Sequence, residues 1–73
     1  MTKKAFGLAL TEVGNKIKVI RKNKGITQVQ MSMDCDMEKA TVSRIESGKT
    51  NVTLITLHRL ATYLEVSVLE FFM

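Results

Sequence analysis

The sequence predicts an all-α fold, a compact domain of five helices, and three observations lead to that prediction. Proline is absent from the 73 residues, so no helix is interrupted by it. Apolar residues recur every three or four positions, which is the period of one helix face. No stretch alternates apolar and polar residues as a half-buried strand does. We expect a single domain over residues 1–73, with residues 1–10 extending its first helix or preceding it.

The first helix is indicated by an apolar stripe that ends at a glycine. Its members are Phe6, Leu10, Val13, Ile17 and Ile20. Gly25 suits the position after a helix, because glycine enters the left-handed region freely. We expect the helix to end at Lys24 and to begin between Lys3 and Thr11.

The second and third helices are marked by their ends. Thr27 and Gln30 form a possible capping box, which predicts a helix over 27–35. Gly48 is a second glycine suited to follow a helix, here one over 38–47. The two helices would be joined by a tight turn.

The last two helices also begin at hydroxyl residues. Thr53 predicts the cap of a helix over 53–64, and Ser67 with Glu70 predicts a capping box before a helix over 67–72. We expect these two helices to fill the core with Leu57, Leu60, Ala61, Leu64, Val68, Phe71 and Phe72.

Composition excludes several functional classes. The 45% apolar content is typical of globular domains, and no apolar run approaches the roughly 18 residues of a membrane span. Cys35 is the one cysteine, and together with His58 it supplies too few ligands for a structural zinc site. The two residues also make no convincing catalytic pair. We expect Cys35 to be buried and His58 to face solvent. We therefore expect no enzyme, no metal, no cofactor, no membrane segment and a cytoplasmic location.

Positive charge is concentrated at one end of the chain. Residues 1–24 hold seven lysines or arginines and one glutamate, whereas residues 25–73 hold four basic and six acidic residues. Such a basic end suits a polyanion, either nucleic acid or a membrane surface. A solubilising helix face explains the same charges equally well.

Two short helices joined by a tight turn are the geometry of a helix-turn-helix, whose second helix enters the DNA major groove. Residues 27–51 read TQVQMSMDCDMEKATVSRIESGKTN, and this segment resembles the core of the phage repressor and Cro-like family, the Xre-type regulators. The similarity extends to GNKIKVIRKNKG before it and LITLHRLATYLEVSVLEFF after it. The resemblance implies a lambda-repressor-like fold with the helix-turn-helix at the second and third helices.

Some residues depart from the family's pattern. Asp36 stands where the turn commonly has glycine, and it can adopt left-handed geometry at some cost. Glu38 stands where serine or threonine normally caps the third helix, so the helix can instead start from Asp36. Met31 and Ser32 replace the usual Leu-Ala pair, and we expect Met31, Met33 and Met37 to serve in packing.

The third helix is predicted to read bases. Val42 and Ile45 must face the core, which turns the opposite side outward. A lysine in the first turn can donate to guanine O6 and N7, and an alanine can contact a thymine methyl group. The expected base contacts are Lys39, Ala40, Arg44 and Glu38, the last with capping as an equal alternative.

Phosphate contacts position such a protein without reading sequence. The resemblance places Gln28 against a phosphate, helped by the N-terminal amides of its helix. The expected set is Gln28, Thr27, Ser43, Ser47, Lys49, Thr50 and Asn51. A plain solvated surface is the alternative for this whole face. The resemblance also implies that Arg21 and Glu46 form a partly buried structural ion pair and not DNA contacts.

Apolar residues left over after the core is filled predict a dimer. They are Leu69 and Met73 on the last helix, with Ile55 and Tyr63 on the fourth. An exposed apolar cluster on a small domain usually marks an interface. The alternative is that Leu69 and Met73 pack on Phe6 and Leu10 within one chain.

These observations favour a sequence-specific regulator of transcription that binds double-stranded DNA as a homodimer on a palindromic operator. The chain is similar to restriction–modification controller proteins. The alternatives are an antitoxin with the same DNA-binding fold and a helical interaction module that binds no DNA. A toxin partner and a contact to RNA polymerase stay open.

Overall fold

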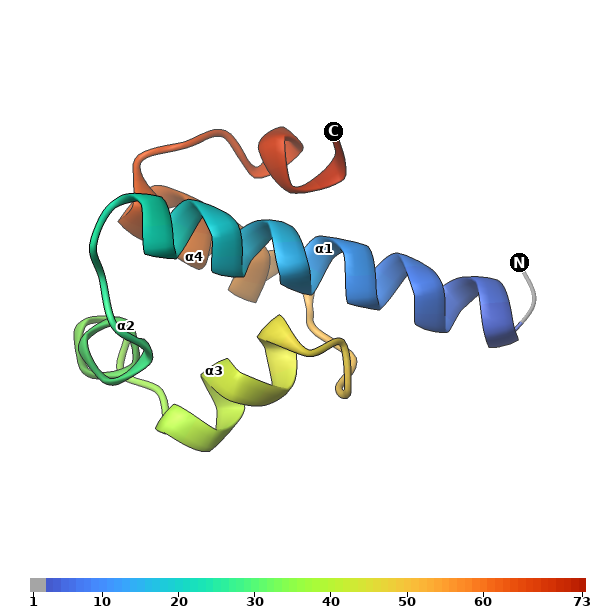
Figure 1. The fold of residues 1–73 in the computed structure, drawn as a ribbon, viewed down its shortest axis with the longest axis horizontal. Helices are drawn as coiled ribbons and strands as arrows, with labels where there is room; N and C mark the ends of the chain where they lie inside the picture. The colour runs from blue at the N-terminus through green and yellow to red at the C-terminus, as the bar shows by residue number, and fades with distance from the viewer. Residues whose placement is uncertain (1–2) are drawn as a thin grey trace.

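Four α-helices and one 3₁₀ helix form the structure, a computed structural model that describes residues 3–73 and their side chains from Gly7 onward. They are α1 (Lys3–Asn23), α2 (Gln28–Asp34), α3 (Lys39–Glu46), α4 (Leu54–Leu64) and η1 (Val68–Phe72). Figure 1 shows α1 crossing the molecule, with α2 and α3 on one side of it and η1 on the other. No strand occurs within the described residues, so the all-α prediction is confirmed.

The prediction of five α-helices is wrong at the last element, which is a 3₁₀ helix. The Glu70 N–H donates to the Ser67 carbonyl at 3.0 Å, three residues back. The Ser67 hydroxyl does cap the helix, but it accepts from the Leu69 N–H at 3.2 Å, so the box with Glu70 is not formed. Five residues suit this tighter helix, which is used in short pieces.

The predicted hydroxyl caps of α2 and α4 are confirmed. The Thr27 hydroxyl accepts from the Gln30 N–H at 3.0 Å, and the Thr53 hydroxyl accepts from the Thr56 N–H at 3.1 Å. Only half of the first capping box forms: the Gln30 Nε2 donates to Asp34 at 2.8 Å, and the side chain accepts no hydrogen bond from the Thr27 N–H.

The turn between α2 and α3 is short and strained at one residue. Asp36 has φ of +55°, the left-handed geometry expected where glycine is common. The cap of α3 is Glu38, whose side chain makes no capping hydrogen bond. The alternative start at Asp36 is therefore wrong, and α3 begins at Lys39.

The apolar core joins all five elements. Its buried members are Val13, Ile17, Met31, Cys35, Val42, Ile45, Leu57, Leu60, Ala61, Leu64 and Phe71. Phe72 is exposed, contrary to prediction, because at three residues per turn it lies a third of a turn from the buried Phe71. Met33 is exposed as well, since Met31 and Cys35 already occupy the inward face of α2.

Two glycines let α1 approach α3 and the loop behind it. A Cβ on Gly14 would overlap the Ile45 carbonyl oxygen and lie 2.8 Å from that of Glu46. Gly48, with φ of +72°, has its backbone against α1, where a Cβ would lie 2.6 Å from the Thr11 Cα. The position of α3 is therefore set by direct contact with α1.

Within the described residues, none of the helices is long and apolar enough to cross a membrane.

Candidate nucleic-acid interface

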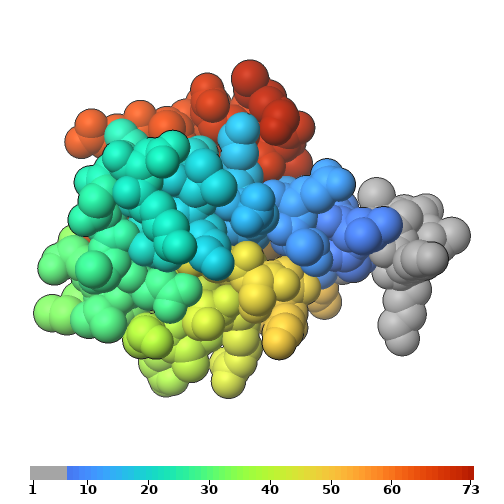
Figure 2. Space-filling view, in the orientation of Figure 1, coloured from blue at the N-terminus to red at the C-terminus, as the bar shows by residue number. Residues whose placement is uncertain are grey.

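The α2–turn–α3 unit lies on one face of the molecule. Figure 2 shows the segments of α2, α3 and the following loop forming a continuous lower face. The Arg59 guanidinium on α4 donates to the Cys35 carbonyl at 2.7 Å and so supports the turn. No pattern in the sequence predicts this role of Arg59. Cys35 is buried and His58 is exposed, as predicted, and burial raises the pKa of the Cys35 thiol.

The two sides of α3 differ as expected. Val42, Ile45 and Glu46 are buried against the domain. Glu38, Lys39, Ala40 and Arg44 are exposed. All of the residues expected to contact bases are therefore accessible, at and after the start of α3.

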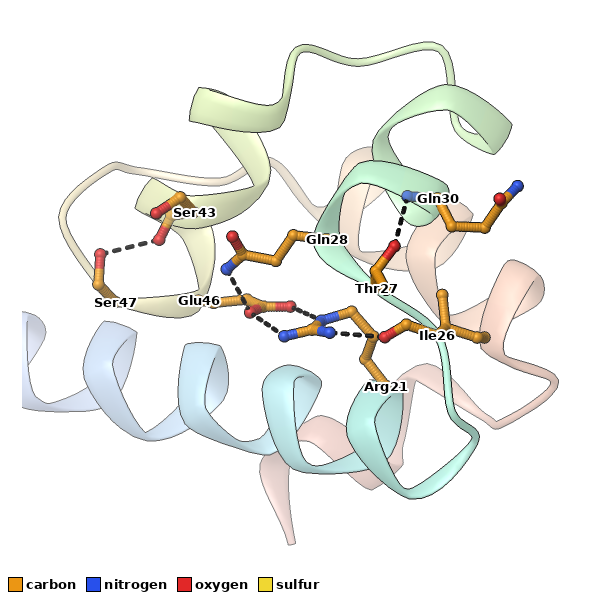
Figure 3. A network of polar contacts seen from close by, with 8 residues as sticks. All are labelled: Arg21, Ile26, Thr27, Gln28, Gln30, Ser43, Glu46 and Ser47. Atoms are coloured by element: carbon orange, nitrogen blue, oxygen red, sulfur yellow. Dashed lines mark hydrogen bonds and ion pairs between the residues drawn. The ribbon is translucent and has the colours of Figure 1, made fainter.

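A buried ion pair holds α3 to α1. The Arg21 Nε donates to Glu46 Oε2 at 2.6 Å, and Arg21 Nη2 donates to Glu46 Oε1 at 3.0 Å (Figure 3). The two side chains are only 6% and 2% exposed. The third nitrogen, Nη1, donates to the Ile26 carbonyl at 2.6 Å, before the start of α2. The predicted structural pair is confirmed, and it connects α1, α3 and the segment that leads into α2.

Gln28 joins the same carboxylate. Its Nε2 donates to Glu46 Oε1 at 2.9 Å, and the side chain is partly buried. Figure 3 shows this amide lying between α2 and α3. Gln28 is expected from the sequence at a phosphate, and its bond to Glu46 is not predictable there, since no local pattern connects residues 18 positions apart.

The other residues expected to contact phosphate differ in the hydrogens that they can offer. Phosphate oxygens accept hydrogen bonds, so a useful hydroxyl must have a free proton. The Thr27 hydroxyl is an acceptor in its cap, which leaves its proton free. The Ser47 hydroxyl already donates to the Ser43 carbonyl at 2.9 Å. Exposed members of the set are Thr27, Ser47, Lys49 and Asn51, whereas Ser43 and Thr50 are half-buried.

A second polar contact joins α4 to α2. The Tyr63 hydroxyl donates to Asp34 Oδ2 at 2.6 Å, and the Gln30 amide donates to Oδ1. These two hydrogen bonds lower the pKa of the Asp34 carboxyl, the one from Tyr63 most. In return, the bond to Asp34 raises the pKa of Tyr63 to about 12. Tyr63 was expected at a dimer interface, and the structure gives its hydroxyl a partner within the chain.

The remaining residues of the predicted interface are exposed in one chain. Leu69 is 66% exposed, Met73 80% and Ile55 76%. Leu69 is therefore not buried against α1. Met73 lines a groove beside α1 residues such as Ala9 and Lys16, and Phe6 lies outside the described side chains. A separate apolar groove is lined by Ala9, Leu10, Val13, Val52, Leu54, Leu57 and Phe72.

The sequence of the helical unit matches a known family. Residues 17–71 match the family model described as helix-turn-helix. The chain belongs to the helix-turn-helix family. This match covers the last third of α1, then α2, the turn, α3 and α4, so the helix-turn-helix assigned from the residues is confirmed.

Relatives of this helix-turn-helix chain include a control protein and an antitoxin. It is 35% identical over 60 residues to the control protein C.MunI of Mycoplasma sp, covering 81% of both chains. It is 32% identical over 57 residues to the antitoxin HipB of Escherichia coli strain K12, covering 78% of this chain and 65% of HipB.

Solved structures of controller proteins have the same fold. The restriction–modification controller protein C.AhdI from Aeromonas hydrophila superposes with a TM-score of 0.81 at 27% identity, covering 85% of this chain and 94% of C.AhdI. The controller C.Esp1396I, solved as a tetramer in complex with its natural 35 base-pair operator, gives a TM-score of 0.77 at 34% identity. That match covers 88% of this chain and 84% of C.Esp1396I.

Proposed function

We propose that this helix-turn-helix chain is a sequence-specific regulator of transcription that binds double-stranded DNA. The observation that carries the proposal is the two-sided α3. One side is fixed to the domain by buried contacts, while Lys39, Ala40 and Arg44 are exposed on the other. A helix held in this way can present side chains to base edges in the major groove.

Base and phosphate contacts have separate roles in this proposal. Lys39 donates to a guanine, Ala40 contacts a thymine methyl, and Arg44 reads a guanine or binds a phosphate. Glu38 has no capping bond, so its carboxylate is available to accept from cytosine N4. The DNA phosphates are bound by Thr27, Gln28, Ser43, Ser47, Lys49, Thr50 and Asn51. Ser47 is the weakest donor of this set because its hydroxyl already donates to the Ser43 carbonyl.

We propose a homodimer on a palindromic operator. Exposed Leu69, Met73 and Ile55 supply apolar area for a symmetric contact, with Tyr63 at its edge. A two-fold pair places two recognition helices about 34 Å apart, which matches half-sites about 10 base pairs apart. The oligomeric complex of C.Esp1396I with its operator supports this arrangement.

Control of a restriction–modification operon is the favoured role. The similarity to C.MunI extends over 81% of each chain, whereas HipB is matched over 65% of its length. A function as antitoxin remains the second candidate, supported by that 32% identity to HipB. Either role is that of a cytoplasmic, non-enzymatic regulator.

The test is selection of bound duplexes from a random pool, followed by binding to the selected site. Lys39→Ala should weaken cognate binding by about 1–3 kcal/mol and relax the preference at one base position. Lys49→Ala is the comparison: it should weaken cognate and random duplexes alike and lower the salt slope by about one. Equal losses on both duplexes for Lys39→Ala would make Lys39 a phosphate contact. A chain that enriches no duplex would be an interaction module instead.

A further inference from the structure

We infer that Gln28 is a positioning residue for base readout, because its amide ties the start of α2 to the end of α3. The inference rests on the proposed DNA-binding function. It changes the role of Gln28 from a phosphate contact alone to a residue that acts through the recognition helix.

The geometry places this bond at the open end of the helix pair. The turn at residues 35–38 joins the end of α2 to the start of α3. Gln28 is the first residue of α2 and Glu46 the last residue of α3, so the 2.9 Å bond between Nε2 and Oε1 joins the two ends that the turn leaves apart. The angle between the helices is thereby held at both ends (Figure 3).

The bond is not needed to neutralise a buried charge. Glu46 already receives two hydrogen bonds and a full positive charge from Arg21. Removing the Gln28 amide therefore leaves the ion pair intact, and one of three donors to the carboxylate is lost. The end of α3 then stays attached to α1 through the ion pair and the close contact at Gly14, and its attachment to the start of α2 is lost.

Loss of this attachment affects the two ends of α3 differently. Lys39 is the first residue of α3 and lies next to the turn, whereas Arg44 lies two residues before Glu46, beside the lost bond. Base preference at the position read by Arg44 should therefore weaken more than base preference at the position read by Lys39.

The amide also has hydrogen-bonding capacity left over. Its second N–H and its Oε1 make no hydrogen bond within the described residues, so a phosphate can still accept from Nε2. A phosphate bound there would contact the same group that holds Glu46. The Gln28 side chain can therefore bind a DNA phosphate at the start of α2 and at the same time hold the end of α3.

The experiment compares Gln28→Met with Gln30→Met in the full chain. Methionine keeps the length of the side chain and removes the donor. Gln30 is the matched control, because its amide also binds a carboxylate, that of Asp34, but on α2 itself. Binding of each variant is measured on the selected duplex and on a random duplex. Amide hydrogen exchange in α3 is measured without DNA.

Gln28→Met should weaken cognate binding by roughly tenfold and random binding by less than threefold, with the loss of preference concentrated at the Arg44 position. Exchange near the end of α3 should become faster in this variant alone. Equal loss on both duplexes with unchanged exchange would reduce Gln28 to a phosphate contact. A variant that is unfolded by circular dichroism would make the bond structural. If the wild-type chain bound no duplex, the proposed function would fail, while the exchange comparison would still test the bond.

Discussion

The α1–α2–α3 contact and the α4–η1 surface of this chain are built in opposite ways. The first buries Arg21 and Glu46 and gives every nitrogen of the guanidinium a partner. The second leaves apolar side chains exposed, among them Ile55, Leu69 and Phe72. The orientation of α3 is therefore determined within one chain, whereas the α4–η1 surface has exposed apolar area.

The largest effect should come from breaking the buried pair. Glu46→Ala leaves the Arg21 guanidinium buried without a countercharge, which typically costs about 3–5 kcal/mol. Urea unfolding followed by circular dichroism measures the loss. Glu38→Ala is the control, since this exposed glutamate makes no capping bond. If the two variants were equally stable, the contact would not hold the domain together.

A smaller loss should follow from separating α1 and α3. Gly14→Ala places a methyl group against the backbone of Ile45 and Glu46, and such overpacking costs about 1–3 kcal/mol. Gly7→Ala in the same helix meets nothing within 4 Å and should stabilise the domain by about 0.5–1 kcal/mol. The two thermal midpoints should move in opposite directions, and a shift of the same sign would contradict the close approach.

A charge on the α4–η1 surface should change the oligomeric state of the chain and not its folding. Leu69→Glu should convert a dimer to a folded monomer, as measured by sedimentation, because the charge cannot be buried in an apolar contact. Met33→Glu is the control, since Met33 is just as exposed but lies on α2. A dimer that persists in Leu69→Glu, or loss of the fold, would refute the interface.

The smallest effect concerns the bond between the two regions, Tyr63 to Asp34. Tyr63 is the one tyrosine and tryptophan is absent, so phenolate absorbance reports it alone. Its pKa of about 12 lies above the ordinary 10, so the stability due to this bond holds up to about pH 10 and is lost from there to about 12. At the acid end, the lowered pKa of Asp34 means that stability is lost as pH falls below 3.8.

Asp34→Asn is the check on this bond. The absorbance midpoint should fall from about 12 toward 10 in this variant. A midpoint near 10 already in the wild-type chain would mean that the Tyr63 hydroxyl does not bind Asp34 in solution.

The elements of the fold were predictable because their signals are local. The hydroxyls of Thr27 and Thr53 cap helices by accepting from the backbone N–H three residues later. The spacing of apolar residues indicates which face of a helix is buried. The 3₁₀ geometry of η1 was not predictable in this way. A run of five residues supports either helix type, and the choice between them decides whether Phe72 points inward or outward.

The candidate site was predictable in part. Arg21, Glu46 and the outward residues of α3 followed from the resemblance and from the inward positions of Val42 and Ile45. The partners of Gln28, Arg59 and Tyr63 did not, because these bonds join residues 18, 24 and 29 positions apart. Pairings of single polar side chains at such separations depend on the packed structure, and a single sequence carries no periodic signal for them.

The division of α3 into a fixed and a free side has an evolutionary consequence. Within the described part of the chain, the side chains of Lys39 and Arg44 make no hydrogen bond or ion pair, so replacing them disturbs nothing that holds the domain together. Surface substitutions of this kind usually change stability by less than about 0.5 kcal/mol. Under the proposed function, descendants of one gene can therefore diverge in operator preference by single substitutions on α3 while the scaffold stays unchanged. Two such paralogues could coexist in one cell and each regulate its own promoter.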